Sequence, residues 1–208
     1  MTKNNYIYKG AEAEICPAKH MDLDVIQKRR ISKSYRIKQI DNKLISFRTK
    51  EEAKLITEAR MQGVPVPIIY DVDLENGVIT MEYLKGQRIK DILNDLNEKE
   101  RNNLCRKIGR SIARLHNSDI IHGDITTSNM ILHNDQVYFI DFGLGEKNNE
   151  LESKGVDLHV LMEAIESTHS KYADCFKYVL EGYKKELKVD ANPVIKKIDD
   201  IVRRGRYR

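Results

Sequence analysis

Two short motifs constrain this chain more strongly than any other part of its sequence. Residues 122–129 read His-Gly-Asp-Ile-Thr-Thr-Ser-Asn, and twelve residues after the final Asn comes Asp141-Phe142-Gly143. With Asp124 and Asn129, this gives the pattern H-x-D-x-x-x-x-N followed by D-F-G, in which a carboxylate orients a nucleophile and hard oxygen ligands hold magnesium on phosphates. The motifs therefore predict a phosphoryl-transfer site with Asp124 as its catalytic residue and Asn129 and Asp141 as its metal ligands.

The composition is that of a globular protein without a membrane segment. Hydrophobic residues make up 40% of the 208, and 36 basic residues stand against 32 acidic ones, which allows one sizeable core or two small lobes. No apolar run is long enough to span a bilayer, and the first residues are not followed by a signal-peptide core. The cysteines Cys16, Cys105 and Cys175 are odd in number and widely spaced, which favours reduced thiols in a cytoplasmic protein.

The first part of the chain is predicted to be rich in strands, with one helix. Asn76-Gly77 between two apolar segments is a strong hairpin signal. A helical stripe of apolar residues stops at Gly63, and the two prolines that follow prevent the helix from continuing. The expected strands are Tyr6–Tyr8, Ala13–Cys16, Asp24–Gln27, Ile68–Val72 and Val78–Tyr83, and the expected helix is Thr49–Gln62.

After Lys85-Gly86 the sequence pattern becomes mostly helical. The expected helices are Ile89–Leu96, Glu98–Asn117, Val156–Ser167, Tyr172–Leu187 and one that begins at Pro193, with short strands at Met130–Leu132 and Val137–Ile140. The chain is thus predicted to have an α+β fold, with a small β-rich lobe over residues 1–84 and a mostly helical lobe over residues 85–208.

A lysine and a glutamate in the first lobe are predicted to complete the site. Lys28 ends a strand-like segment and Glu52 lies in the helix that follows, an arrangement in which a carboxylate holds a lysine beside nucleotide phosphates. Arg29 and Glu51 compete for the same two roles, because the sequence alone does not fix the register.

The loop expected to cover the nucleotide is unusual. Kinases carry Gly-x-Gly-x-x-Gly, so that backbone amides can approach the phosphates, whereas this chain has Gly10-Ala11-Glu12-Ala13-Glu14. Two carboxylates beside a triphosphate are electrostatically unfavourable. Either the loop lies farther from the phosphates, or Glu12 has a gating or metal-related role.

The segment after the second motif is too short for a long activation segment. Asp157 follows Asp141 by only 16 positions, and the segment between them contains no Ala-Pro-Glu. Because peptide kinases use that segment as a platform for the substrate chain, its absence argues against phosphorylation of ordinary protein substrates. Within the first motif, His122 is expected to be a core histidine, and residues 126–128 are expected to be local caps, with substrate-facing or metal-adjacent roles as alternatives.

The end of the chain is strongly basic. From residue 196 to residue 208, six basic residues stand against two acidic ones, a local charge of +4 that equals the charge of the whole chain. The closing Arg-Gly-Arg-Tyr-Arg is predicted to break the last helix and form a flexible tail suited to a phosphate backbone, with a merely solvated surface as the alternative. The candidate nucleic-acid contacts are Arg203, Arg204, Arg206 and Arg208.

Taken along its whole length, the chain resembles the small atypical kinase of the KEOPS complex, the PRPK-type subunit. Several of the matching motifs are specific to that family rather than to kinases in general. Besides the two catalytic motifs, they are Lys9-Gly10-Ala11-Glu12-Ala13, Arg30-x-x-Lys33-x-Tyr35-Arg36, Phe47-Arg48-Thr49 with Glu52-Ala53, Val64-Pro65-Val66-Pro67, Lys154-Gly155-Val156-Asp157-Leu158 and Arg203-Arg204-Gly205-Arg206.

The resemblance implies a two-lobed protein-kinase-like fold that uses ATP and Mg²⁺ within an assembly that installs a threonylcarbamoyl group on an adenosine of tRNA. The transfer itself would belong to a partner subunit of the KEOPS complex, and family members are also described as autophosphorylating serine/threonine kinases. Asp124 would be the catalytic acid/base or orient water, Asp157 would brace the catalytic loop, and the basic tail would contact tRNA. The residues implied at the nucleotide are Gly10, Ala11, Glu12, Lys28, Glu52 and, through backbone groups that meet the adenine, Glu82 to Leu84.

Two other classes of protein remain open from the sequence. A small-molecule phosphotransferase of the aminoglycoside or choline kinase type uses the same H-G-D-x-x-x-x-N loop, although it usually carries a larger helical lobe. A kinase-fold scaffold would not need both metal ligands. The sequence also leaves open whether the phosphoryl acceptor is water, a protein side chain or an intermediate, and whether the chain stands alone or belongs to a fusion with its partner.

Overall fold

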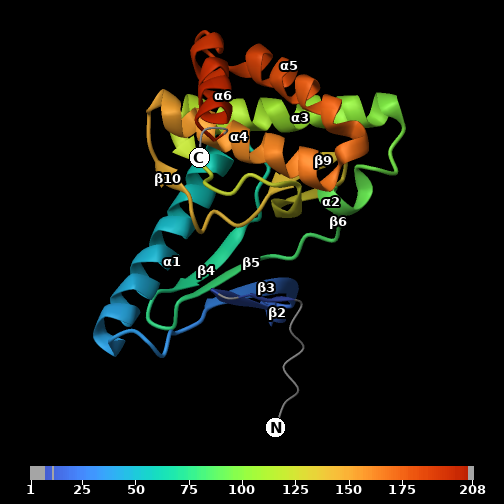
Figure 1. The fold of residues 1–208 in the computed structure, drawn as a ribbon. Helices are drawn as coiled ribbons and strands as arrows, with labels where there is room; N and C mark the ends of the chain where they lie inside the picture. The colour runs from blue at the N-terminus through green and yellow to red at the C-terminus, as the bar shows by residue number, and fades with distance from the viewer. Residues whose placement is uncertain (1–7, 11, 206–208) are drawn as a thin grey trace. The chain divides into compact units, whose positions relative to one another are not determined.

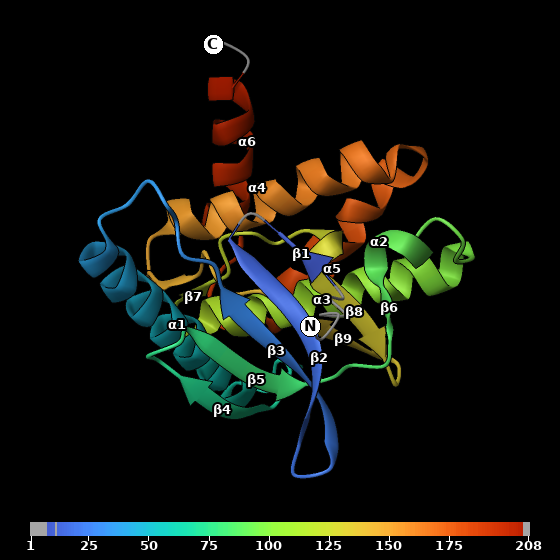
Figure 2. The same cartoon turned by 90° about the horizontal axis from the view of Figure 1, so that it is seen from below.

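The chain forms two compact units in the computed structural model, which describes residues 8–10 and 12–205. The first unit contains the described residues up to Thr57 together with Pro67–Leu84, and the second contains Glu58–Val66 and the chain from Lys85 onward. Strands and one long helix make up the first unit, and helices dominate the second (Figures 1 and 2). The predicted α+β class is therefore confirmed, although residues 58–66 pack with the second unit.

The first unit is a five-stranded antiparallel sheet with the order β1-β2-β3-β5-β4. Ala53 of helix α1 packs with Ile79 and Met81 of β5 to form its apolar cluster. Lys28 of β3 pairs with Ile15 of β2 and Ile79 of β5, so it lies within the sheet and not at its edge. The elements are β1 (Tyr8–Lys9), β2 (Ala13–His20), β3 (Leu23–Arg30), α1 (Lys38–Met61), β4 (Ile69–Asp73) and β5 (Val78–Glu82).

Two hairpins of this sheet show how turn residues set strand length. Met21 and Asp22 join β2 to β3 with φ angles of 46° and 65°, a left-handed conformation that is uncommon for a methionine. The two strands are consequently longer than predicted, with eight residues each. The predicted hairpin at Asn76-Gly77 is confirmed between β4 and β5, with Gly77 at a φ of 64°. Residues 6 and 7 of the first predicted strand lie outside the described residues.

Helix α1 begins at Lys38, eleven residues earlier than predicted. Its first half carries exposed apolar side chains such as Ile40, which hide the amphipathic pattern that marks a helix in a sequence. Near this end, the buried Asp41 carboxylate accepts hydrogen bonds from Ser32 Oγ at 2.6 Å and from the Lys33 N–H at 3.0 Å. The Ser32 hydroxyl, and then the Lys33 N–H, hold the pKa of Asp41 below its usual range.

The second unit consists mainly of helices and contains two small antiparallel sheets, β6-β8-β9 and β10-β7. Asn97 and Glu100 form a capping box, and α3 has the predicted bounds, Glu98–Asn117. Helix α2 is shorter than predicted, and α4 begins five residues earlier than predicted, at Leu151. The elements are β6 (Gln87–Arg88), α2 (Ile89–Ile92), α3 (Glu98–Asn117), β7 (Ile120–Ile121), η1 (Thr127–Asn129), β8 (Met130–His133), β9 (Gln136–Phe139), β10 (Glu146–Lys147), α4 (Leu151–Thr168), η2 (Ser170–Cys175), α5 (Phe176–Glu186) and α6 (Asn192–Gly205).

Glycines bring α3 and α5 into backbone contact. A Cβ on Gly109 of α3 would lie 1.9 Å from the carbonyl oxygen of Val179, and one on Gly182 of α5 would lie 2.2 Å from the carbonyl oxygen of Arg106. Any larger residue at either position would force the two helices apart. This close pair supports the buried face of α3, which leads directly into the catalytic loop.

The last helix, α6, begins with Asn192, so Pro193 lies in its first turn as expected, and the helix runs to Gly205. Residues 206–208 of the predicted tail lie outside the described residues. Val194 and Ile198 bury one face of the helix. Near its end Arg204 forms an ion pair with Glu152 of α4, a contact between elements that the local sequence does not reveal.

The described part of the chain contains no helix long and apolar enough to cross a membrane. Cys16, Cys105 and Cys175 are free cysteines, as their spacing predicted. A hydrogen bond with Cys175, together with burial, raises the pKa of the Cys105 thiol above its ordinary value. That thiol therefore stays protonated.

Candidate active site

The catalytic loop of the second unit holds Asp124 in place through Asn129. The loop runs from β7 through η1 to β8. The amide nitrogen of Asn129 donates to the carbonyl oxygen of Asp124 at 3.0 Å and to its carboxylate Oδ2 at 2.8 Å. Two of the three residues predicted from the two motifs are thus brought into direct contact.

The hairpin β8–β9 brings Asp141 to the same end of the sheet as Asn129. Met130, which follows Asn129, pairs with Phe139, and the Ile140 N–H donates to the Asn129 carbonyl at 3.0 Å. Asp141 comes next, with a φ of 65°, and its Oδ1 accepts the N–H of Gly143 at 3.3 Å. A left-handed aspartate is uncommon, and strained backbone of this kind concentrates at functional sites.

The oxygens of Asn129 and Asp141 fit the chemistry of a magnesium site. Magnesium takes hard oxygen ligands, usually one or two carboxylates together with waters and phosphate oxygens. Because Asn129 directs its amide nitrogen toward Asp124, its Oδ1 is left without a hydrogen bond among the residues that the structure describes. The amide is therefore oriented with its oxygen available as a ligand.

His122 is a buried core histidine, as the sequence predicted. Its Nε2 donates to the Ile140 carbonyl at 3.1 Å, and its Nδ1 accepts the Asp124 N–H at 3.3 Å, so both bonds are made by the neutral ring. Burial lowers the pKa of His122, which keeps it neutral. Its ring also packs against Phe142 with 4.4 Å between centroids, which ties the catalytic loop to the D-F-G turn.

Gly123 occupies a position that has no room for a side chain. Its φ is 81°, and a Cβ there would lie 2.3 Å from the carbonyl oxygen of Leu144. Only glycine meets both conditions. This explains physically why the chain has His-Gly-Asp where many kinases have His-Arg-Asp, since the backbone of Leu144, directly after Gly143, passes close to this point.

Asp157 of α4 braces the loop from beneath, as the resemblance implied. Its fully buried carboxylate accepts the N–H of His122 at 2.8 Å and that of Gly123 at 2.9 Å. The side chain of His116 lies 3.3 Å from the same carboxylate and 2.9 Å from the Tyr183 hydroxyl. Burial, and then the charge of Asp157, raise the pKa of Tyr183 above its ordinary value, so the phenol stays protonated and can donate to His116.

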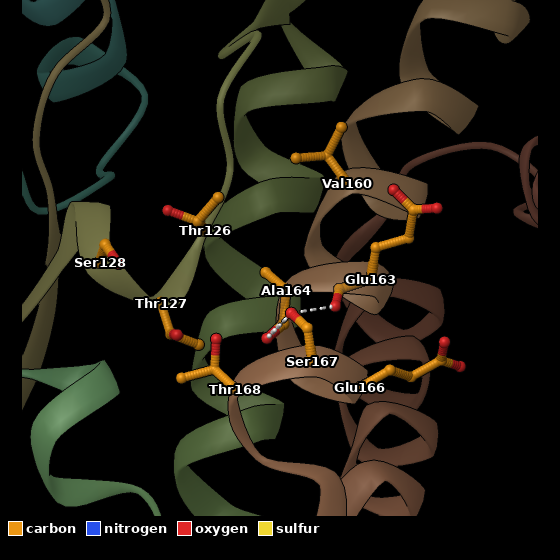
Figure 3. A pocket seen from close by; sticks show the side chains of 9 residues that line it. All are labelled: Thr126, Thr127, Ser128, Val160, Glu163, Ala164, Glu166, Ser167 and Thr168. Atoms are coloured by element: carbon orange, nitrogen blue, oxygen red, sulfur yellow. Dashed lines mark hydrogen bonds between the residues drawn. The ribbon is translucent and has the colours of Figure 1, made fainter.

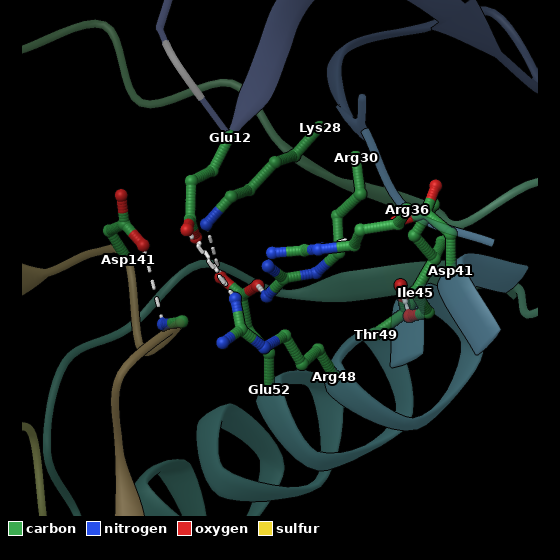
Figure 4. A network of polar contacts seen from close by, with 11 residues as sticks. Glu12, Lys28, Arg30, Arg36, Asp41, Ile45, Arg48, Thr49, Glu52 and Asp141 are labelled. Carbon is green, nitrogen blue, oxygen red and sulfur yellow. Dashed lines mark hydrogen bonds and ion pairs between the residues drawn. The ribbon is translucent and has the colours of Figure 1, made fainter. Parts of the chain in front are cut away.

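In the first unit, Glu52 of α1 is buried between two cations (Figure 4). Its Oε1 lies 2.5 Å from Lys28 Nζ and its Oε2 lies 2.5 Å from Arg30 Nη2. All three residues are less than a tenth exposed. The predicted register is therefore observed: Lys28 and Glu52 form the pair, while Arg29 is exposed and Glu51 is half-buried.

The acidic nucleotide loop is neutralised in part by α1. The carboxylate of Glu12 lies 3.2 Å from Arg48 Nη1, one helical turn before Glu52 (Figure 4). The Gly10 N–H donates to the Ala13 carbonyl at 2.9 Å, and Ala11 lies outside the described residues. The Arg48 contact gives the unfavourable Glu12 charge a counterion within its own unit.

The segment expected to meet the adenine follows β5. The backbone N–H of Glu82 donates to the Ile68 carbonyl at 2.8 Å, and its carboxylate accepts the Ile68 N–H at 3.1 Å. Leu84 is buried. These bonds tie the end of β5 to the segment before β4, and the adenine contact stays a prediction.

Sequence reasoning named Arg30 and Arg48 in motifs but gave them no role at the site, although their spacing could have indicated one for both. Arg30 lies two residues after Lys28 on β3, and alternate residues of a strand share a face. Arg48 precedes Glu52 by four residues, one turn of helix. A third missed contact, between His169 Nε2 and the Thr127 hydroxyl at 3.1 Å, joins residues far apart in the chain and left no local signal.

The basic residues predicted to bind nucleic acid are only partly described. Arg203 and Arg204 lie on the last turn of α6 and are exposed. Arg204 forms its ion pair with Glu152, and Lys197 lies 3.3 Å from the same carboxylate. Arg206 and Arg208 lie outside the described residues.

The catalytic loop and the D-F-G turn of the second unit carry motifs that are typical of protein-kinase-like phosphoryl transfer, and the first unit contains a buried lysine–glutamate pair of the kind that such proteins use. A protein-family model described as the RIO domain matches residues 3–154. The chain belongs to this family of atypical kinases.

Relatives of known name give a closer comparison. The chain is 47% identical to the "KEOPS complex subunit Bud32" of Pyrococcus abyssi, over 97% of this chain and 96% of the relative. It is 41% identical to the "Probable serine/threonine-protein kinase BUD32 homolog" of Archaeoglobus fulgidus, over 97% and 95%. It is also 45% identical to the "Probable bifunctional tRNA threonylcarbamoyladenosine biosynthesis protein" of Methanobrevibacter smithii, over 98% of this chain but only 37% of that relative. The resemblance read from the motifs is confirmed.

Proposed function

We propose that this chain is a Mg²⁺-dependent ATPase and atypical kinase that works as a subunit of a KEOPS-type assembly in the threonylcarbamoyl-adenosine modification of tRNA. The arrangement of Asp124, Asn129 and Asp141 carries the proposal. It gives the chain a positioned carboxylate and oxygen ligands at the end of one hairpin. The names of the relatives support the biological setting, since one is a KEOPS subunit and another a tRNA threonylcarbamoyladenosine biosynthesis protein.

In this proposal each residue has a separate task. Asp124 accepts the proton of the attacking hydroxyl or water, and Asn129 keeps its carboxylate oriented. The Oδ1 of Asn129 and the carboxylate of Asp141 hold magnesium, which when bound neutralises charge on the phosphates. Lys28, held by Glu52, contacts the phosphates, while residues 10–12 cover them and residues 82–84 meet the adenine.

A partner that carries out the threonylcarbamoyl transfer fits two observations. In the M. smithii relative, the region similar to this chain is only 37% of a longer protein whose printed name is bifunctional. On α1, Ile40 and Phe47 are 58% and 60% exposed and lie seven residues apart on one helix face. Tyr35 and Ile37, which come just before this helix in the chain, are also exposed. Apolar surface of this kind is typical of a protein interface.

The experiment that tests the proposal is phosphate release from ATP. We expect the purified chain to hydrolyse ATP in the presence of Mg²⁺ and to do so faster with the threonylcarbamoyl-transferase subunit and tRNA, because the partner and its RNA complete the assembly. Chelation of Mg²⁺ should stop the reaction. If an aminoglycoside or choline increased ATP turnover more than the partner subunit and tRNA did, the result would instead support a small-molecule phosphotransferase.

The basic end of the chain is expected to contribute to tRNA binding. Changing Arg203, Arg204, Arg206 and Arg208 to glutamine should weaken tRNA binding and flatten its dependence on salt. Each lost phosphate contact should reduce the slope of log K against log salt by about 0.7–0.9. Fluorescence anisotropy of labelled tRNA at several salt concentrations measures this slope. The matched control changes Lys171, Lys184, Lys185 and Lys188 to glutamine, which removes the same charge from exposed positions elsewhere. Equal slopes for the two variants would mean that the end of the chain has no special role.

A further inference from the structure

A pocket of about 790 Å³ lies in the second unit between residues 126–128 of the catalytic loop and the second half of α4 (Figure 3). The three loop side chains have different surroundings. Thr126 and Ser128 are half-buried and make no side-chain hydrogen bond to any residue that the structure describes, and Thr126 does not cap η1 as the sequence led us to expect. Thr127, by contrast, is only 1% exposed. The loop side chain that is fixed by burial is therefore that of Thr127.

The buried Thr127 hydroxyl is bound by a histidine at the end of α4. Its Oγ1 lies 3.1 Å from Nε2 of His169, the residue that follows the last residue of the helix. Figure 3 shows the Thr127 side chain directed toward Thr168, which directly precedes this histidine. His169 is also 1% exposed, and its backbone N–H donates to the Ile165 carbonyl at 2.8 Å. The ring is thus attached to the end of a long helix.

The second ring nitrogen of His169 defines how the first one bonds. Nδ1 lies 2.8 Å from Asn94 Oδ1, and because an amide oxygen can only accept, Nδ1 carries the proton. Burial lowers the pKa of His169, so the ring stays neutral and Nε2 has a lone pair. The Thr127 hydroxyl therefore donates to Nε2. Through this ring the catalytic loop is joined both to α4 and to the segment between α2 and α3.

The anchored threonine begins the short η1 turn that ends at Asn129. In this turn the Asn129 N–H donates to the Thr126 carbonyl at 3.0 Å, and the Asn129 side chain donates to Asp124 Oδ2 at 2.8 Å. The direction of the Asn129 side chain thus depends on the backbone of a turn that His169 holds at Thr127. Since a displacement of about 1 Å at a reacting group can lower a rate by about 10²-fold, this anchor matters for the chemistry at Asp124.

We propose that His169 is a positioning residue for phosphoryl transfer, which holds the catalytic loop through the Thr127 hydroxyl and so fixes Asn129 and Asp124. This rests on the proposed function of the same site. The role is geometric, because the ring stays neutral and exchanges no proton with the substrate. Its loss should therefore lower kcat and leave the KM for ATP unchanged, since the groups proposed to contact and cover the phosphates, Lys28 and residues 10–12, belong to the first unit.

The test is ATP hydrolysis by the full chain at saturating Mg²⁺. Thr127→Val keeps the shape of the side chain and removes its hydroxyl, while His169→Asn can keep the bond to Asn94 but is too short to reach Thr127. We expect each change to lower kcat by about 10- to 100-fold at an unchanged KM for ATP. Thr127→Ser restores the hydroxyl, and His169→Gln restores an acceptor at the position of Nε2, so both should retain most of the wild-type kcat.

A double variant shows whether the two residues act through one bond. Thr127→Val with His169→Asn should be no slower than the slower single variant, because both changes remove the same hydrogen bond. The matched controls make the same changes nearby: Thr168→Val at an exposed position directly before His169, and His159→Asn ten residues earlier on α4. Both controls should keep the wild-type kcat.

An unchanged kcat in Thr127→Val, additive losses in the double variant, or an equal loss in the controls would overturn the proposal. So would a loss in His169→Asn that His169→Gln does not restore, because the ring would then serve only the fold. Circular dichroism of each variant checks folding, and if His169→Asn does not fold, the comparison of Thr127→Val with Thr127→Ser decides. If the unaltered chain hydrolyses ATP and these variants do so equally well, the positioning role fails while the proposed ATPase stands. If the unaltered chain does not hydrolyse ATP, both fail.

Discussion

Replacing Asp124 with asparagine is expected to lower the rate of ATP turnover by about 10²–10⁴-fold while leaving the chain folded. Positioned general bases contribute rate factors of this size. An asparagine at this position can still accept the hydrogen bond that Asn129 Nδ2 donates at 2.8 Å, so the loop keeps its geometry and loses only the basic oxygen. Phosphate release under saturating ATP measures the effect, and ATP binding measured separately should change little.

The matched control for this prediction is Asp135→Asn. Asp135 lies in the turn between β8 and β9, where its φ is 58°, a conformation that asparagine also adopts readily. Its side chain is exposed, and its ion pair with Lys107 is of the surface kind that contributes little. Turnover should therefore be unchanged in the control. Undiminished turnover in both Asp124→Asn and Asp141→Ala would refute the assignment of the active site.

The parts of the site that could be predicted are those in which function requires a fixed local spacing. The sequence indicated Asp124, Asn129 and Asp141 because one loop and the hairpin that follows it bring them together, and both are formed by residues close in the chain. Lys28 and Glu52 were found because one strand and one helix each contribute a single side chain. Their roles in catalysis and metal binding remain predictions, but the contacts on which those roles depend are present.

The parts that could not be predicted depend on contacts between distant segments or on unusual local conformations. The start of α1 was missed because exposed apolar side chains such as Ile40 hide its helical pattern. The turn at Met21 and Asp22 was missed because neither residue signals a left-handed conformation. The ion pair of Arg204 with Glu152 could not be predicted because it joins residues about 50 positions apart. The pocket beside the catalytic loop likewise combines residues 126–128 with α4, which only the fold brings together.

Replacing Glu52 with glutamine is expected to destabilise the chain strongly, by about 3–5 kcal/mol. The carboxylate of Glu52 is almost fully buried and lies 2.5 Å from both Lys28 and Arg30, so its loss removes the counterion that these two buried cations share. Breaking a buried pair costs about this much, because the remaining charge stays desolvated. The loss is large against the stability of about 5–15 kcal/mol that is usual for a folded protein. Urea unfolding followed by circular dichroism measures it.

Glu51→Gln is the matched control, since it makes the same change one residue earlier on the same helix. Glu51 is only half-buried, and removing its charge should change the free energy of unfolding by less than about 1 kcal/mol. A double variant, Glu52→Gln with Lys28→Met, should recover part of the lost free energy of unfolding, because it removes one of the two buried cations that Glu52 had balanced. If Glu51→Gln destabilises the chain as much as Glu52→Gln does, or if the double variant is no more stable than Glu52→Gln alone, the buried ion triad does not hold this unit together. If the double variant recovers part of the stability but does not turn over ATP, then Lys28 has two separate roles. It balances the charge of Glu52 in the folded chain, and it contacts the phosphates during turnover.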